Sequence, residues 1–196
     1  NEIRLASTST GRVYAVWNDP TTIWLARSAD GGQTWTVSDV DQDDRGNNWV
    51  PRLCAQGDQV VLSYRSYDLA GVDTSFWGTV SGDSGATWSA KTQLRPESAA
   101  STVDYTNVVC DGAGGAIATW TDMRNPAAGE IYVNRYDGGT WLGDVPLSTS
   151  SLHNQKSFNQ IFAGEGKVLV AYGNDDGTWM QRSLDGGVTF QPAVPF

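Results

Sequence analysis

Acidic residues in one polar stretch of this chain stand at a spacing that could bind a metal ion. Asp39, Asp41 and Asp43 alternate with other residues, and alternating carboxylates can converge on a hard cation such as calcium. The glycine that a calcium loop needs next is replaced by Asp44, and no glutamate follows at the required spacing. We therefore expect a solvated acidic loop and no cofactor, with calcium as the alternative.

Aromatic and charged residues in other polar stretches could bind a sugar. Aromatic rings can stack on the faces of pyranose rings, while Asp and Arg side chains hydrogen-bond hydroxyl groups. Most of the tryptophans stand in expected strands or turns, where they would belong to the core. The residues expected to bind a ligand are Trp49, Tyr67, Asp68, Tyr105, Asp122 and Arg124.

A repeated motif indicates which elements position these residues. Residues 28–35, 81–88 and 183–190 each read S-x-D-x-G-x-T-[W/F], and a shortened copy occupies 136–141. The aspartates of the four copies follow one another at steps of 53, 54 and 48 residues. Such a period in a strand-rich chain indicates a propeller or another stacked array. The structural residues expected in these turns are Asp30, Gly32, Thr34, Trp35, Asp83, Gly85, Thr87, Trp88, Asp137, Asp185, Gly187, Thr189 and Phe190.

Apolar runs recur in phase with this motif. Each unit has a weak first strand, a run that ends in an aromatic residue, a second alternating run, the turn, and a short last strand. Helix formers are scarce, whereas strand formers and glycine are plentiful. We therefore expect an all-β fold, a β-propeller of four four-stranded antiparallel blades, in a single domain. The expected blades are approximately 1–43, 44–97, 98–150 and 151–196.

The residue types of the motif suit a structural role in a hairpin turn. The Asp carboxylate can accept hydrogen bonds from the backbone of its own turn, and glycine supplies a positive φ. The Trp or Phe that ends the motif can pack into the sheet of the blade. These roles account for the motif without any catalytic function.

The repeated turn resembles the Asp-box, also called the bacterial neuraminidase repeat, and three of the four copies match it closely. Residues 13–35 resemble secreted bacterial proteins of the sialidase-like propeller superfamily, and the resemblance extends over the whole chain. It implies four-stranded blades around an axis, with ligands bound at the face opposite the Asp-boxes. Sialidases of this type have six blades. A closed four-bladed propeller, a part of a larger one, and an open half completed by another copy therefore stay open as alternatives.

The resemblance also implies what a catalytic site would contain. Sialidase chemistry uses three arginines that clamp a carboxylate, a tyrosine nucleophile activated by a glutamate, and an aspartic acid. The residues that could fill these roles are Arg52, Arg65, Arg124, Tyr105, Glu97 and Asp68. The family's Arg-Ile-Pro signature is absent, and the nearest string is Val50-Pro51-Arg52. A non-catalytic module that binds carbohydrate or protein is therefore favoured, with an exo-α-sialidase-like glycoside hydrolase as the alternative.

Charge and cysteine content set further expectations. A net charge of −9 disfavours binding to nucleic acid, and no apolar run is long enough to insert into a membrane. Because the chain begins with Asn1 rather than Met, we expect a processed or excised chain. The resemblance to secreted bacterial proteins implies a location that is secreted or at the cell surface. No Asn-x-Ser/Thr acceptor occurs, which favours a bacterial source. Cys54 and Cys110 occupy equivalent positions in neighbouring units, so we expect buried free thiols rather than a disulfide.

Overall fold

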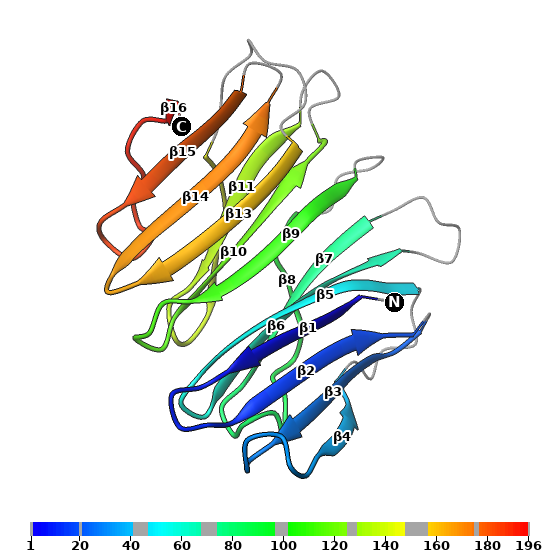
Figure 1. Ribbon diagram of the computed structural model, residues 1–196. Helices are drawn as coiled ribbons and strands as arrows, with labels where there is room; N and C mark the ends of the chain where they lie inside the picture. Colours follow the sequence, from blue (N-terminus) through cyan, green and yellow to red (C-terminus); the bar gives the residue numbers. More distant parts are fainter. Residues whose placement is uncertain are drawn as a thin grey trace. The chain divides into compact units, whose positions relative to one another are not determined.

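The computed structural model describes residues 2–19, 21–40, 47–67, 74–96, 102–124, 129–147, 157–174 and 177–195. Its strands form four antiparallel sheets, and each sheet pairs four strands in sequence order (Figure 1). In these residues there is no helix, and hence none that could span a membrane. The predicted fold class, an all-β propeller type with four four-stranded antiparallel blades, is confirmed.

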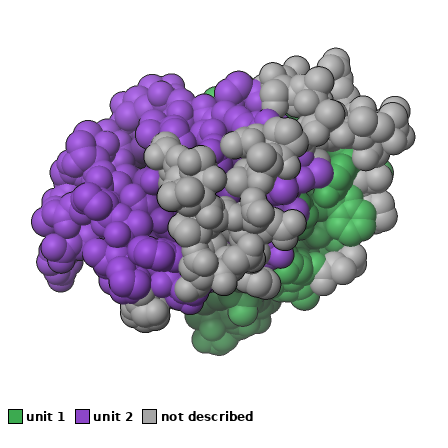
Figure 2. All heavy atoms as spheres, turned by 90° about the horizontal axis from the view of Figure 1, so that it is seen from above, with its two compact units in different colours: residues 1–93 green, residues 94–196 purple. Residues whose placement is uncertain are grey.

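The chain divides into two compact units, Asn1–Gln93 and Leu94–Phe196 (Figure 2). The first unit contains blades 1 and 2, and the second contains blades 3 and 4. The proposed grouping of all four blades into a single domain stays a prediction.

Blades 1 and 2 are meanders of four strands each, so every strand pairs with its neighbour in the sequence. The pairing of the first strand shifts register in blade 2, and it does so again in blades 3 and 4. Blade 1 consists of β1 (Ile3–Ser7), β2 (Val13–Asn18), β3 (Ile23–Ser28) and β4 (Thr36–Asp39). Blade 2 consists of β5 (Asn47–Gln56), β6 (Gln59–Tyr67), β7 (Thr74–Ser81) and β8 (Thr92–Gln93).

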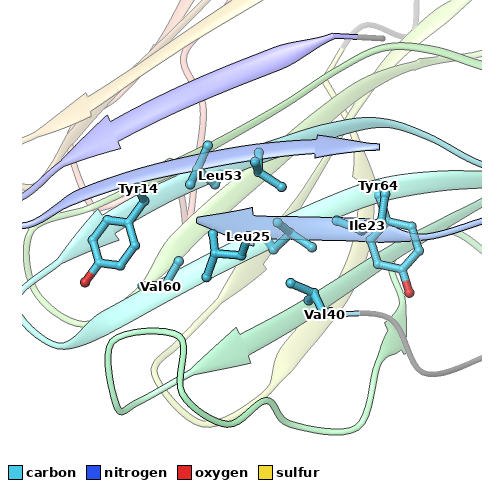
Figure 3. Packing of buried hydrophobic residues seen from close by; sticks show 9 residues of the cluster. Tyr14, Ile23, Leu25, Val40, Leu53, Val60 and Tyr64 are labelled. Atoms are coloured by element: carbon cyan, nitrogen blue, oxygen red, sulfur yellow. The ribbon is translucent and has the colours of Figure 1, made fainter. Parts of the chain in front are cut away.

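The first unit is held together by apolar side chains that alternate along its strands. On β2, Tyr14 and Val16 are buried, while Ala15 between them is only half-buried. Successive side chains of a strand point to opposite faces, which explains this alternation. Leu25 on β3 lies directly across from Val16. These residues form one core with Leu62 and Tyr64 of blade 2 (Figure 3). Burial of such side chains is the main favourable contribution to folding.

Blades 3 and 4 repeat this arrangement in the second unit. Ile117 and Val133 of blade 3 share a core with Val168, Val170 and Tyr172 of blade 4. Blade 3 consists of β9 (Val103–Cys110), β10 (Ala116–Asp122), β11 (Glu130–Tyr136) and β12 (Trp141–Pro146). Blade 4 consists of β13 (Ser157–Gly164), β14 (Lys167–Asn174), β15 (Gly177–Ser183) and β16 (Val194–Pro195).

The repeated turns join the third and fourth strands of their blades through a fixed set of hydrogen bonds. In the turn of blade 1, Asp30 Oδ1 accepts hydrogen bonds from the backbone N–H groups of Gln33 and Thr34, at 3.0 and 2.9 Å. Asp30 Oδ2 accepts the Thr34 hydroxyl at 2.5 Å, and the Ser28 hydroxyl donates to Oδ1 at 2.7 Å. The turns that contain Asp83 and Asp185 have the same bonds. Each aspartate therefore closes its own turn.

The cysteines correct one prediction. The structure contains no free cysteine, and both Cys54 and Cys110 are disulfide-bonded. The expectation of free thiols was therefore wrong. A disulfide requires Cα atoms about 4.4–6.8 Å apart, and equivalent places in a sequence repeat do not by themselves determine that distance.

Candidate functional site

At one end of each blade, the start of the first strand lies beside the end of the second strand. We call it the loop end. In blade 1, for example, Ile3 at the start of β1 pairs with Trp17 near the end of β2. The repeated turn lies at the other end, because it follows the third strand, which runs away from the loop end. The ligand residues expected from the sequence are therefore sought at the loop ends, in each unit separately.

In blade 2 the loop end presents Trp49. Trp49 on β5 pairs with Arg65 on β6, and a bulge interrupts the ladder between Trp49 and Arg52. Val50 in this bulge has a φ of 54°, a conformation that β-branched residues avoid. The guanidinium carbon of Arg65 lies 5.9 Å from the ring centre of Tyr67. Because the indole of Trp49 is still 42% exposed, the pair of strands offers an aromatic surface beside a cation.

Arg52 lies beyond the bulge and is bound by a carboxylate. Its Nη1 donates to Glu2 Oε2 at 2.7 Å, and Arg4 Nη2 donates to Glu2 Oε1 at 2.8 Å. Burial opposes the charge of Glu2, but the hydrogen bonds and charges of both arginines outweigh it and lower the pKa of Glu2. Burial lowers the pKa of Arg52, and the nearby charges of Arg4 and Arg65 add to that effect. Glu2 therefore joins Arg4 to Arg52 and neutralises part of their charge.

Asparagine side chains join the loop ends of blades 1 and 2. Asn18 Nδ2 donates to the carbonyl oxygen of Asn48 at 3.0 Å, and Asn48 Nδ2 donates to the carbonyl oxygen of Thr21 at 2.9 Å. Both asparagines are buried. Buried amides that satisfy backbone groups stabilise a particular conformation of that backbone. These bonds therefore fix the backbone next to Trp49.

Blade 3 places Asp122 in a buried cluster of charges. Asp122 Oδ2 accepts hydrogen bonds from Arg95 Nε at 3.1 Å, Trp120 Nε1 at 3.0 Å and Arg124 Nη2 at 2.6 Å. Burial opposes ionisation of this carboxyl group, but the bonds from Arg124 and Trp120 outweigh it and lower the pKa of Asp122. Arg124 Nη2 also lies 2.6 Å from Asp144 Oδ2. Arg124 is therefore held by two carboxylates of its own blade.

A tyrosine and a glutamate that were not among the predicted site residues meet in the same blade. The Tyr132 hydroxyl donates to Glu130 Oε2 at 3.0 Å, and the Arg124 guanidinium lies 4.0 Å from the Tyr132 ring centre. Glu130 and Tyr132 stand at i and i+2 of β11, and side chains at this spacing share a face of the strand. Burial, followed by the hydrogen bond to Glu130, raises the pKa of Tyr132 to about 12. The phenolate that a nucleophile needs is therefore disfavoured at neutral pH.

Tyr105 stands at the loop end of blade 3 in a strained backbone conformation. Its φ is 48°, the register of β9 and β10 shifts beside it, and the residue is 41% exposed. Its carbonyl oxygen accepts a hydrogen bond from Asn159 Nδ2 of blade 4 at 2.7 Å. Asn159 is buried and also accepts the Thr119 hydroxyl at 2.7 Å. A bond from a neighbouring blade thus holds the bulge that presents the ring.

Trp49 and Tyr105 lie at the first-strand bulges of blades 2 and 3, one place apart in register. Tyr105 lies inside its bulge, as Val50 does in blade 2, whereas Trp49 pairs with Arg65 immediately before the bulge. Each precedes a cysteine by five residues, Cys54 and Cys110, and each stands where the pairing of its first strand shifts. In blade 4 the register of β13 shifts between Ser157 and Asn159, at Phe158. An aromatic residue in or beside the first-strand bulge is therefore a repeated feature of blades 2, 3 and 4.

Four of the predicted site residues lie outside the described residues, namely Asp41, Asp43, Asp68 and Glu97. Asp39 ends β4. Among the residues that are described, no group of three His, Cys, Asp or Glu side chains is placed to hold a metal ion. In unit 1 the structure brings together Trp49, Arg52, Arg65 and Tyr67, and in unit 2 it brings together Asp122 and Arg124.

Comparisons with known proteins identify relatives by fold. No family model matches the sequence, and no curated protein matches it. A protein of unknown function from Dyadobacter fermentans aligns with a TM-score of 0.70 and 16% identity over 98% of this chain and 68% of its own. A Hadza microbial sialidase aligns at 0.66 and 13% identity, over 96% and 45%. The GH93 alpha-L-arabinofuranosidase of Fusarium graminearum aligns at 0.60 and 17% identity, over 93% and 62%.

These similarities concern the fold, since the identities lie between 13% and 17%. The chain spans less than half of the sialidase and about three fifths of the arabinofuranosidase. The chain is therefore similar in fold to the sialidase and to the arabinofuranosidase.

Proposed function

We propose that this chain is a non-catalytic propeller module with Asp-box turns that binds carbohydrate at its loop ends. The observation that carries the proposal is the pair of exposed aromatic residues Trp49 and Tyr105. They lie at the first-strand bulges of blades 2 and 3, one in each unit, and each bulge contains a residue with positive φ, Val50 or Tyr105. Strained backbone that the surrounding structure maintains is typical of functional sites. Aromatic rings at such places are suited to stack on sugar rings, and nearby polar groups can bind hydroxyls.

The electrostatic environment supports binding rather than catalysis. Two of the arginines that a carboxylate clamp would need, Arg52 and Arg124, are occupied by Glu2 and by Asp122 with Asp144. The tyrosine that contacts a glutamate, Tyr132, has a raised pKa and is buried. A protonated and covered phenol is a poor nucleophile.

A secreted or cell-surface location accompanies the proposal, with a bacterial source. Disulfides persist mainly in oxidising compartments, and both cysteines of this chain are disulfide-bonded. The net charge of −9 supports a ligand other than nucleic acid.

The test is a glycan array probed with the wild-type chain and three variants. Trp49→Ala and Tyr105→Asn remove the proposed stacking rings, and Asn tolerates the left-handed conformation at position 105. Trp35→Ala is the matched control, because Trp35 is 44% exposed but lies in a repeated turn at the opposite end of its blade. Truncation of an anchoring residue costs about 2 kcal/mol or more, so affinity should fall at least about 30-fold in the first two variants.

Binding that survives both loop-end variants, or that Trp35→Ala removes equally, would refute the assignment of the site. A blank array with correctly folded protein would refute carbohydrate as the ligand. A protein partner whose binding is lost in Trp49→Ala would keep the site and change the ligand class.

A second candidate is a glycoside hydrolase of sialidase type, which is favoured by Arg4 and Arg52 binding one carboxylate together. The two arginines could bind a sugar carboxylate in the same way if Glu2 were displaced. Turnover of a fluorogenic sialoside that is lost in Arg52→Ala would establish it. Absence of turnover by the wild-type chain would exclude it.

A further inference from the structure

Blade 1 has apolar side chains on both of its faces. One face contains Val16 and Leu25 and is covered by blade 2. The register of β1 to β4 places a second set on the other face, in two rows across the sheet. Leu5 on this face is 69% exposed. We call this the front face of blade 1, and it consists of Ile3, Leu5, Ala15, Trp17, Trp24 and Val37.

Blade 4 has the corresponding property at the other end of the chain. One of its faces contains Val170 and Tyr172 and is covered by blade 3. The other face is apolar as well, and Phe162 on it is 64% exposed. We call this the back face of blade 4, and it consists of Phe162, Leu169, Ala171, Met180, Arg182 and Val194.

The repeat shows what kind of surface the front face is. The aromatic residue that closes the second strand is Tyr64 in blade 2 and Tyr172 in blade 4, and both are buried in a core shared with the preceding blade. In blade 1 the equivalent residue is Trp17, which lies on the front face. The front face is therefore the type of surface that packs against a preceding blade.

The back face is the complementary type. Three residues before the aromatic residue that closes the second strand stands Tyr14 in blade 1 and Ile117 in blade 3. Both belong to a core shared with the following blade. In blade 4 the equivalent residue is Leu169, on the back face. The chain therefore carries both of the surface types that meet when two blades pack.

The glycines of the repeated turns show independently which side of a blade packs against the blade before it. A Cβ added to Gly85 of blade 2 would lie 2.6 Å from Leu25 and 3.9 Å from Arg27 of blade 1. A Cβ added to Gly187 of blade 4 would lie 3.3 Å from Ile117 and 3.8 Å from Arg135 of blade 3. Each of these turns is thus covered by the blade before it.

Gly32 in blade 1 lacks such a cover. An added Cβ there would meet only Trp35 of its own turn, at 3.5 Å. Arg27 and Arg135 are the arginines that lie over the turn of the following blade. On their own sheets they pair with Tyr14 and Ile117, which belong to the core shared with that following blade. In blade 4 the arginine at this place is Arg182, which pairs with Leu169 on the back face.

We infer that the front face of blade 1 binds the back face of blade 4 of a second copy of this chain, with Arg182 of one copy over Gly32 of the other. This contact between copies is independent of carbohydrate binding. Burial of the exposed apolar side chains provides the driving force. Because two different surfaces meet, the contact is heterologous and produces a head-to-tail assembly or a ring. The net charge of −9 per chain opposes the contact, so added salt should strengthen it.

The test compares mass in solution, by light scattering and sedimentation over a range of protein and salt concentrations. Leu5→Glu disables the front face and Phe162→Glu disables the back face, and both side chains are exposed enough that the monomer should fold. Val188→Glu is the control, since Val188 is an exposed apolar residue of a repeated turn that lies outside both faces. The wild type and Val188→Glu should associate, and each of the other two variants should be monomeric.

Mixing the two disabled variants gives the decisive result. Each retains one functional face, so a mixture of Leu5→Glu and Phe162→Glu should form a one-to-one dimer and nothing larger. A wild type that stays monomeric at all concentrations would overturn the proposal. Association that persists in either single variant, or a mixture that stays monomeric, would overturn the heterologous pairing, because it would show contact through other surfaces.

Discussion

Asn159 Nδ2 donates a hydrogen bond of 2.7 Å to the carbonyl oxygen of Tyr105, and so links the first strand of blade 4 to the bulge of blade 3. Asn107 Nδ2 donates in turn to the Asn159 carbonyl oxygen at 2.8 Å. The strained conformation of Tyr105, with a φ of 48°, is therefore supported from outside its own strand. This is how a residue in a disfavoured backbone region can keep its ring exposed.

Substitution of Asn159 by Leu should destabilise the second unit. The carbonyl oxygen of Tyr105 and the hydroxyl of Thr119 would each lose this hydrogen bond in a buried environment. A lost partner of this kind costs about 1–3 kcal/mol, so the free energy of unfolding measured with urea should fall by that amount. Gln160→Ala, on the next and exposed residue of β13, is the control and should change it little. Equal effects of the two substitutions would contradict the role of Asn159.

The charge of Asp122 should matter more for stability than that of Asp144. Asp122→Asn keeps the shape of the side chain but removes the carboxylate that Arg95 and Arg124 share. Breaking a buried ion pair typically costs about 3–5 kcal/mol, because a charge loses its compensation away from water. Asp144→Asn removes a partner of Arg124 alone and should cost less. Thermal unfolding of both variants measures the difference, and a larger loss in Asp144→Asn would disprove this ranking.

The repeated turns should make the protein sensitive to acid. The Ser183 hydroxyl, followed by the Thr189 hydroxyl and backbone bonds, holds the pKa of Asp185 well below its ordinary value of 3.8. The Thr34 and Thr87 hydroxyls do the same for the pKa values of Asp30 and Asp83. Since the folded state has the lower pKa, it binds fewer protons than the unfolded state. The stabilisation is complete above the unfolded pKa and is lost as the pH falls through 3.8 toward the folded pKa.

Thr189→Val tests this assignment at one turn. The substitution removes the hydroxyl that donates to Asp185 Oδ2 at 2.6 Å. The pKa of Asp185, followed by NMR titration of its carboxyl carbon, should rise toward 3.8. Thr178→Val in the same blade leaves the turn intact and should not change it. An unchanged titration of Asp185 in Thr189→Val would show that the hydroxyl does not hold the charge.

Both cysteines should resist alkylation until the protein is reduced. Iodoacetamide added to denatured but unreduced protein should modify neither Cys54 nor Cys110, because both are disulfide-bonded. After reduction, mass spectrometry should detect two modified cysteines. Modification without a reductant would show that the protein contains free thiols.

Much of the architecture could be predicted from the order of residue types. Alternation such as that of Tyr14 and Val16 produces strands with a buried face, and the interval between the repeated turns sets the length of a blade. These signals depend on residues close together in the chain. For the same reason the exposed ligand candidates Trp49 and Tyr105 could be selected from the sequence.

The partners of the candidate residues could not be predicted in this way. Arg52 binds Glu2 across 50 residues of sequence, and Asn159 reaches Tyr105 across 54. Nothing near Arg52 in the chain indicates that a carboxylate will neutralise it. Glu130 and Tyr132 stand two residues apart on one strand, but alternation alone does not show that their polar groups form a hydrogen bond.

The sequence by itself determined the all-β fold class, the four sheets and the turns that close them, because local patterning and turn chemistry act within a blade. Only the tertiary structure decided which charges are neutralised, that the cysteines are oxidised, and that the front face of blade 1 and the back face of blade 4 keep exposed apolar side chains. The physical reason is that hydrogen bonds, disulfides and burial depend on distances between segments that are remote in sequence, and a linear pattern does not contain those distances.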